Sequence, residues 1–85
     1  MQFTYHTDPG HGWIEVSFAD LVSVGLKPDD FSQYSYRSGE YAYLEEDCDA
    51  AVFVNAWKQV RGESPKFREL HTDSDSRIRT YKRIK

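Results

Sequence analysis

Apolar and polar residues alternate along residues 2–7 and again along residues 13–18, a pattern that predicts two β-strands. The segment between them, Thr-Asp-Pro-Gly-His-Gly, is rich in turn-forming residues, so the two strands are expected to form a hairpin. One register gathers the apolar side chains on one face, and this consistency favours it over a register shifted by one residue. In that register the facing pairs are Tyr5–Ile14 and Phe3–Val16 on the apolar face, and His6–Trp13 and Thr4–Glu15 on the other.

Apolar residues at helical spacing predict one main helix over residues 48–61. Asp47 is the predicted N-cap, because its carboxylate can accept hydrogen bonds from the free N–H groups of the first turn. Gly62 is expected to follow the helix in the left-handed conformation that glycine adopts readily. The predicted apolar stripe comprises Phe53, Ala56, Trp57 and Val60, widened by Val52.

A short helix is predicted over residues 18–24, with Ser17 as its N-cap and Gly25 just after its end. A second hairpin is predicted over residues 31–46, with a first strand over 31–37 and a turn at Ser38-Gly39. Two registers remain open. A two-residue loop pairs Tyr36 with Tyr41 and Tyr34 with Tyr43 on one face, whereas a bulge at Gly39 divides the tyrosines between the faces.

The C-terminal part of the chain predicts a fifth strand over residues 66–72 and then a polar loop. Residues 77–85 alternate Ile78 and Ile84 with basic residues, as in an edge strand or a frayed tail. The expected fold is α+β: a small antiparallel sheet of two hairpins plus a C-terminal strand, with the main helix packed on one face and a second short helix. The chain is long enough for a single domain, residues 1–85, in which 73–85 form a loosely held basic edge strand or tail.

The net charge of −3 conceals a strong asymmetry along the chain. Residues 1–56 carry ten acidic and two basic side chains, whereas residues 57–85 carry four acidic and nine basic ones. Two interpretations follow. The basic end folds back over the acidic body, or the two ends form oppositely charged faces for macromolecular partners.

Neither export nor a membrane location is expected from this sequence. The single cysteine excludes an internal disulfide and fits a reducing cytoplasm. No apolar run approaches the ~18 residues of a membrane span, and the N-terminal residues lack the layout of a signal peptide. We therefore expect a cytoplasmic protein without a membrane partner.

Two clusters carry residues suited to a metal or enzymatic site, and the sequence favours neither as such a site. His6, Asp8 and His11, with His71 as a further ligand, offer donors for a transition metal, but there is no second cysteine and no His-Glu-x-x-His helix. Cys48 is flanked by Asp47 and Asp49, whose negative charge opposes formation of a thiolate. The sequence predicts no cofactor, no metal and no catalytic set.

Two surfaces are candidates for binding a macromolecule. The first is a partner-binding set of imidazoles, carboxylates and an aromatic ring around the 8–13 loop and the acidic run: His6, Asp8, His11, Trp13, Glu45, Glu46 and Asp49. The second, an alternative for nucleic acid, combines C-terminal cations with an aromatic ring that can stack on a base: Arg77, Arg79, Tyr81, Lys82 and Arg83.

Three blocks of the sequence, in this order, are similar to a family of small proteins encoded by tailed bacteriophages, prophages and other mobile elements. They are Asp8-Pro9-Gly10-His11-Gly12-Trp13-Ile14-Glu15-Val16, Tyr34-Ser35-Tyr36, and Tyr43-Leu44-Glu45-Glu46-Asp47-Cys48-Asp49-Ala50. The resemblance carries no enzymatic activity with it. It implies a small accessory protein of the bacterial cytoplasm, often encoded among genes that manipulate the host or its defences.

The sequence as a whole predicts a non-enzymatic, phage-type accessory protein that binds a bacterial host macromolecule, with a host protein as the first expectation. The alternative is a nucleic-acid-binding accessory domain that uses the basic C-terminus. A small metal-dependent or thiol enzyme is the third and least favoured hypothesis.

Overall fold

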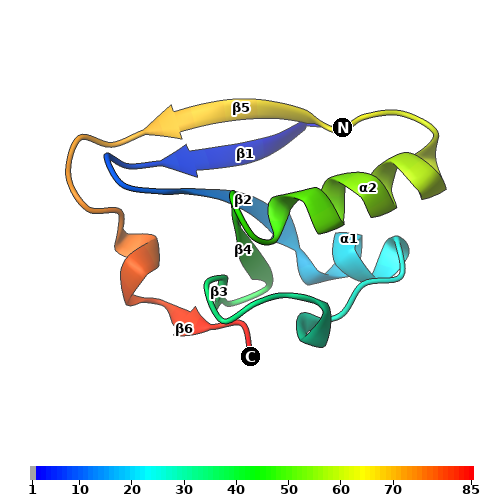
Figure 1. Cartoon of the computed structure of the whole chain (residues 1–85), viewed down its shortest axis with the longest axis horizontal. Helices are drawn as coiled ribbons and strands as arrows, with labels where there is room; N and C mark the ends of the chain where they lie inside the picture. The colour runs from blue at the N-terminus through cyan, green and yellow to red at the C-terminus, as the bar shows by residue number, and fades with distance from the viewer. Residues whose placement is uncertain (1) are drawn as a thin grey trace.

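The computed structural model describes residues 2–85, and within them the chain forms one six-stranded mixed sheet with two α-helices (Figure 1). The strand order is β5-β1-β2-β4-β3-β6. The strands are β1 Gln2–Thr7, β2 Gly12–Ser17, β3 Tyr36–Ser38, β4 Tyr41–Glu45, β5 Lys66–His71 and β6 Lys82–Arg83. The helices are α1 Phe18–Ser23 and α2 Ala50–Arg61, with short 3₁₀ turns η1 Pro28–Asp30 and η2 Arg77–Thr80. This architecture confirms the α+β class.

The sheet is mixed rather than purely antiparallel, because β5 pairs with β1 in parallel. Strand β4 also runs parallel to β1, since each is antiparallel to β2. The connection from β4 to β5 is therefore a crossover between parallel strands, and α2 supplies it, as a helix usually does. Figure 1 shows α2 crossing one side of the sheet toward the outer edge, where β5 lies.

The predicted register of the first hairpin is confirmed. Tyr5 pairs with Ile14, His6 with Trp13 and Thr4 with Glu15. Period-two alternation then separates the two faces. Phe3, Ile14 and Val16 lie in the main core, whereas Trp13 belongs to a smaller apolar cluster.

The end of α2 agrees with the prediction, but its beginning does not. Gly62 follows the helix with φ 76°, in the left-handed region. The prediction of Asp47 as N-cap is wrong, because the helix begins at Ala50 and Asp49 occupies the cap position without a side-chain cap bond. The Glu45 carboxylate accepts from the backbone N–H groups of Asp47 and Cys48, which turns the chain before the helix starts.

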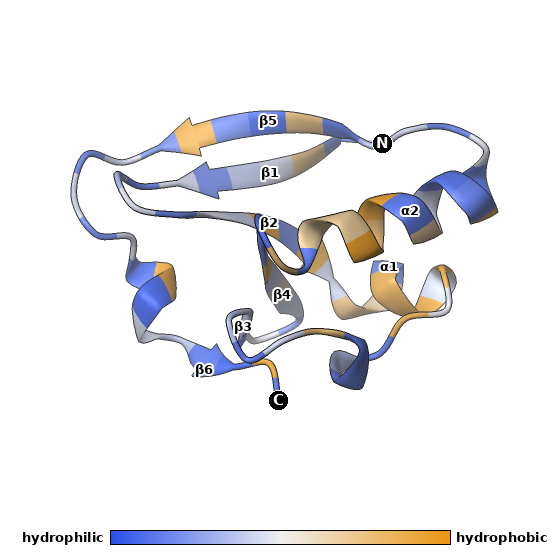
Figure 2. Cartoon of the chain, in the orientation of Figure 1, coloured by the Kyte–Doolittle hydropathy of each residue, from blue (hydrophilic) through white to orange (hydrophobic). Residues whose placement is uncertain are grey.

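The buried stripe of α2 is centred closer to its N-terminus than predicted. Phe53 and Trp57 are buried, and Val54 packs on the main core beside them. Val60, predicted in the stripe, is 56% exposed, because helix positions 50, 53, 54 and 57 face the sheet. The Phe3 ring meets the rings of Phe53 and Trp57 edge-on, each with centroids 5.1 Å apart, which ties α2 to β1. Figure 2 shows hydrophobic residues recurring along both α1 and α2, whereas β6 is hydrophilic.

The short helix α1 is confirmed with its cap. The Ser17 hydroxyl accepts from the Asp20 backbone N–H at 3.0 Å, which satisfies a free donor of the first turn. Gly25, just beyond the helix, has φ 82°.

The second hairpin adopts neither predicted register. Tyr36 pairs with Tyr43 and Ser38 with Tyr41, so the two loop residues are Gly39 and Glu40, and Gly39 has φ 59°. The first strand is also shorter than the predicted 31–37. The segment before Tyr36 instead bonds to the side chain of Asp49, and the Ser35 hydroxyl accepts from the backbone N–H of Glu45 at the end of β4.

The C-terminal segment forms η2 and the edge strand β6, which pairs with β3. Both of its isoleucines are buried: Ile84 in the main core and Ile78 in the smaller cluster. Arg79 reaches back to Asp8, so the basic end of the chain contacts the acidic body at this point. None of the helices in residues 2–85 is long and apolar enough to cross a membrane.

Candidate functional site

A second, smaller apolar cluster lies on the sheet face opposite α2. It consists of Trp13, Tyr43 and Ile78, with Tyr36 and Tyr81 packed against it. Trp13 faces away from α2 because its neighbour Ile14 faces the main core. Segment η2 contributes Ile78 and so covers part of this face, which no α-helix covers in residues 2–85.

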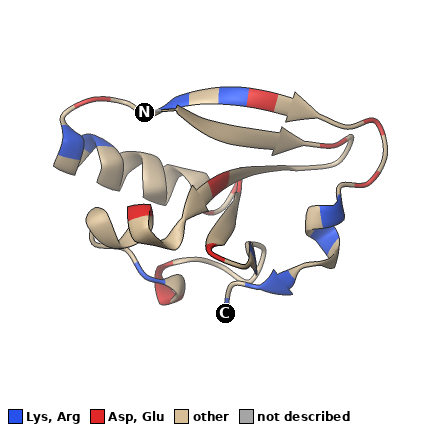
Figure 3. Cartoon of the chain, turned by 180° about the vertical axis from the view of Figure 1, so that it is seen from behind, with Lys and Arg blue, Asp and Glu red and all other residues tan. Residues whose placement is uncertain are grey.

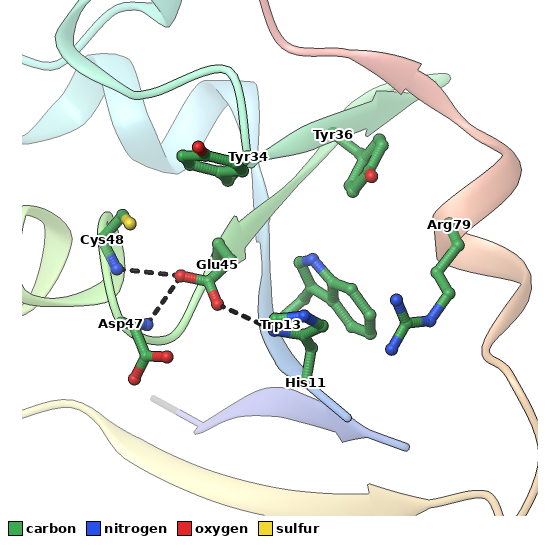
Figure 4. Close-up of a pocket in the computed structure, with 8 residues that line it drawn as sticks. All are labelled: His11, Trp13, Tyr34, Tyr36, Glu45, Asp47, Cys48 and Arg79. Carbon is green, nitrogen blue, oxygen red and sulfur yellow. Dashed lines mark hydrogen bonds and ion pairs between the residues drawn. The ribbon is translucent and has the colours of Figure 1, made fainter. Parts of the chain in front are cut away.

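A pocket of about 230 Å³, which we call the aromatic pocket, opens beside this cluster (Figure 4). Its walls come from five separate segments of the chain: the start of β2, the 31–36 segment, the end of β4, the turn before α2, and η2. Sites for drug-sized ligands usually occupy ~300–1,000 Å³, so this pocket suits a group the size of one side chain. The lining residues are His11, Trp13, Tyr34, Tyr36, Glu45, Asp47, Cys48 and Arg79.

Trp13 forms the wall of the pocket and carries an unsatisfied donor. The residue is 2% exposed, and its indole N–H has no acceptor among residues 2–85. Leaving a buried donor unpaired costs about 1–3 kcal/mol. Figure 4 shows the indole nitrogen turned toward the side of the pocket where Tyr34 and Tyr36 lie. The N–H therefore favours an acceptor supplied from outside the chain.

Glu45 places a buried carboxylate beside Trp13. The residue is 5% exposed, and its Oε1 accepts from the backbone N–H groups of Asp47 at 2.8 Å and Cys48 at 2.9 Å. Its Oε2 lies 3.4 Å from Nδ1 of His11, which is about half exposed. One carboxylate oxygen thus holds the turn, while the other retains capacity to accept (Figure 4).

Asp8 fixes the position of Arg79 at the opposite side of the pocket. The buried Asp8 carboxylate accepts from Arg79 Nε at 2.7 Å and Nη2 at 2.9 Å. It also accepts from the backbone N–H groups of Gly10, His11 and Ser76. The Arg79 hydrogen bonds hold the pKa of Asp8 well below its usual range; the backbone donors add to this, and burial opposes it. Asp8 in turn raises the pKa of Arg79, whose guanidinium lies 5.3 Å from the Trp13 ring centre.

Asp49, another predicted partner-binding residue, lies inside the fold. Its carboxylate accepts from the backbone N–H of Ser32 at 3.0 Å and from the hydroxyls of Ser32 and Ser35. These bonds fix the segment that carries Tyr34 into the pocket. Asp8 and Asp49 therefore position residues that line the aromatic pocket. Their own carboxylates already have hydrogen-bond partners within the chain.

Three of the predicted partner-binding residues meet in the aromatic pocket: His11, Trp13 and Glu45. Glu46 lies apart from them and accepts from the Tyr5 hydroxyl, whose pKa is raised by burial and by this carboxylate. The sequence prediction did not place Tyr34 or Tyr36 at this site. Their only signal was the run of tyrosines in the second hairpin, whose register the sequence left open.

His6 lines a separate, larger pocket of about 540 Å³ between β1, β5 and the segment leading to η2. Its Nε2 lies 3.1 Å from the Glu15 carboxylate, and burial together with Glu15 raises the pKa of the neighbouring Tyr43 to about 12. His71 Nδ1 lies 2.8 Å from the Thr7 hydroxyl. However, that hydroxyl donates to Glu69 at 3.0 Å, so His71 is not placed to take its proton as a catalytic base would.

The thiol of Cys48 is exposed at the rim of the aromatic pocket. Its pKa is raised by desolvation and then by the negative charge of Glu45, which disfavours the reactive thiolate. Within residues 2–85, no group of three or more His, Cys, Asp or Glu side chains is arranged to hold a metal ion.

Of the residues predicted to bind nucleic acid, three are exposed and two make contacts within the fold. Arg77, Lys82 and Arg83 are exposed on η2 and β6, where Figure 3 shows basic residues gathered. Tyr81 instead packs against Tyr43, with ring centroids 5.2 Å apart, and Arg79 is held by Asp8. Arg83 donates to the backbone carbonyl of Gln33 and lies over the Tyr36 ring, which leaves Arg77 and Lys82 as the more accessible cations for an anionic partner.

No protein-family model, curated protein or solved structure matches this chain.

Proposed function

We propose that this protein is a non-enzymatic, phage-type accessory protein that binds a bacterial host protein through the aromatic pocket and so modulates host or defence functions. The observation that carries the proposal is the buried Trp13 N–H, which has no acceptor among residues 2–85 and lies at a pocket of side-chain size. Binding a partner group there would satisfy a donor that folding alone leaves unpaired.

The composition of the pocket supports a protein as the partner. Tryptophan, tyrosine and arginine are the residue types most enriched at the energetic centres of protein interfaces, and Trp13, Tyr34, Tyr36 and Arg79 line this pocket. Tyr34 is 53% exposed, so it can contact a partner surface without a change of fold. A non-enzymatic role also agrees with two features of the nucleophile candidates. The raised pKa of Cys48 disfavours the reactive thiolate, and the Thr7 hydroxyl donates its proton to Glu69 rather than to His71.

Capture of a host protein from bacterial lysate, with and without nuclease, tests this proposal. The wild-type protein is expected to retain a stoichiometric protein partner after nuclease treatment, identified by mass spectrometry. Tyr34→Ala is expected to reduce the affinity for the partner about thirtyfold, since truncating a tyrosine at an interface centre costs about 2 kcal/mol.

Tyr41→Ala is the matched control, because Tyr41 is a similarly exposed tyrosine, at 43%, that does not line the pocket. Tyr41→Ala should capture as much host protein as the wild type does. Equal capture by Tyr34→Ala and the wild type would contradict the pocket as the binding site.

The exposed cations of η2 and β6 favour a second candidate function, binding of nucleic acid along the C-terminal segment. In that case the combined variant Arg77→Ala, Lys82→Ala and Arg83→Ala should lose affinity for single-stranded DNA or RNA. The slope of log affinity against log salt should become shallower by about 2, since ~0.7 counterions are released per contact with a single strand. Fluorescence anisotropy at several salt concentrations measures both, and affinity that does not change with salt would exclude this function.

A further inference from the structure

The aromatic pocket places an unused donor beside a partly used acceptor. Trp13 and Glu45 are directly paired across β2 and β4, so their side chains leave the same face of the sheet. The Trp13 N–H has no acceptor among residues 2–85, and Glu45 Oε2 makes a long contact of 3.4 Å with His11 Nδ1. A group that satisfies both positions carries an acceptor for the indole N–H and a donor for the carboxylate, and an amide carries both on one carbon.

The walls of the pocket select a flat group of limited size. Trp13, Tyr34 and Tyr36 present aromatic surfaces, on which planar groups pack well. The volume of about 230 Å³ lies below the ~300–1,000 Å³ of sites for drug-sized ligands, which limits the bound group to about the size of one side chain.

The charges of the pocket and the unpaired Trp13 N–H together favour a neutral group over an ion. A carboxylate or phosphate would meet Glu45 and Asp47, while the positive charge of Arg79 is already compensated by Asp8. A cation would be attracted by these carboxylates, but it carries no acceptor for the Trp13 N–H. Arg79 also already lies over the Trp13 ring, 5.3 Å from its centre.

We propose that the aromatic pocket binds a primary carboxamide, the side chain of a glutamine or asparagine of the partner protein. The carbonyl oxygen accepts from the indole N–H of Trp13, and the amino group donates to Oε2 of Glu45. The choice of a protein side chain as the source of this carboxamide rests on the proposed function; the chemistry of the group rests on the pocket alone.

Two-dimensional ¹H–¹⁵N NMR of the whole chain tests this inference with N-acetyl-glutamine N-methylamide as the probe. The chain has two tryptophans, and Trp57 lies in the main core, so its indole signal serves as an internal control. The Trp13 indole N–H signal is expected to shift downfield with saturation at a dissociation constant in the millimolar range, as for a small fragment. The Trp57 signal should not move.

The matched probe, N-acetyl-glutamate N-methylamide, replaces the amino group with a charged oxygen and should leave the Trp13 signal unchanged at the same concentrations. Glu45→Gln removes the acceptor at Oε2 while conserving size. It should lower the affinity for the glutamine probe about tenfold. Tyr34→Ala, at an exposed position, should weaken it as well, and Tyr41→Ala should have no effect. Binding that persists in both Glu45→Gln and Tyr34→Ala would overturn the proposal.

Three further results would also overturn it: no shift of Trp13 with the glutamine probe, equal binding of the glutamate probe, or tighter binding of guanosine monophosphate. The last would assign the pocket to a nucleobase. If the glutamine probe does not bind while capture of a host protein still depends on Tyr34, the pocket does not bind a carboxamide and the proposed function stands. If the probe binds while no host protein is captured, the proposed function is wrong and the assignment of a carboxamide to the pocket stands.

Discussion

Asp8→Ala is expected to lower the free energy of unfolding by about 3 kcal/mol, one of the two largest effects that we predict from the structure. Five hydrogen bonds converge on the buried Asp8 carboxylate: two from Arg79 and one each from the backbone of Gly10, His11 and Ser76. Its removal leaves three backbone donors and a guanidinium without an acceptor. Urea unfolding followed by tryptophan fluorescence measures the change.

Asp73→Ala is the control for this prediction, because Asp73 is fully exposed and its carboxylate lies 3.3 Å from His71 Nε2 at the surface. A surface change of this kind should stay within about 0.5 kcal/mol of the wild type. A double-mutant cycle with Arg79→Ala isolates the ion pair, and a coupling of at least about 1 kcal/mol is expected. A loss below about 1 kcal/mol in Asp8→Ala would show that Asp8 does not hold the two ends of the chain together.

The same carboxylate predicts how stability responds to acid. Because the folded-state pKa of Asp8 lies below the unfolded-state pKa, the unfolded chain binds more protons at low pH. The stabilisation from Asp8 is therefore complete above about pH 5 and is lost as the pH falls below the ordinary carboxyl range near 4 toward the folded pKa. Asp8→Asn lacks this dependence, so its urea midpoint should fall less between neutral pH and about pH 3 than that of the wild type. An equal fall in both proteins would assign the acid sensitivity to other carboxylates.

Local patterns predicted those features of the fold that depend on neighbouring residues. The register of the first hairpin follows from the apolar residues Phe3, Ile14 and Val16, because any shift by one residue would move them out of the core. The cap at Ser17 and the glycine at position 62 likewise act within one helical turn. In each case the competing arrangement would expose apolar surface or leave backbone groups unpaired.

The second hairpin and the aromatic pocket depend on contacts that no local pattern specifies. Tyr36 pairs with Tyr43 because the loop is Gly39-Glu40, one residue later than the predicted turn. Arg79 reaches the pocket through an ion pair with Asp8, from which it is separated by most of the chain. His11, Trp13 and Glu45 were predicted as candidates, but the sequence did not show that they share one pocket with Tyr34 and Tyr36.

The acidic run before α2 also shows that a local pattern does not identify which carboxylate acts as a cap. Glu45, Asp47 and Asp49 are all suited to cap a nearby turn or helix, and sequence pattern alone favoured Asp47. In the structure the Glu45 carboxylate accepts from the backbone N–H groups of this turn, and the side chain of Asp47 is exposed. Asp49 is buried because the serines of the 32–35 segment supply it with donors, and that segment lies well before it in the sequence.

Asp49→Ala is therefore expected to cost about 2–4 kcal/mol of unfolding free energy, whereas Asp47→Ala should stay within about 0.5 kcal/mol of the wild type. Asp49→Ala leaves the hydroxyls of Ser32 and Ser35 and one backbone N–H without their acceptor. Because these bonds also fix the segment that carries Tyr34, the variant should lose capture of the host protein even at temperatures where it remains folded. Urea unfolding and the capture experiment, performed on both variants, measure the two effects. If Asp47→Ala proves as destabilising as Asp49→Ala, the cap of α2 lies at Asp47 after all, and the 31–35 segment is held by other contacts.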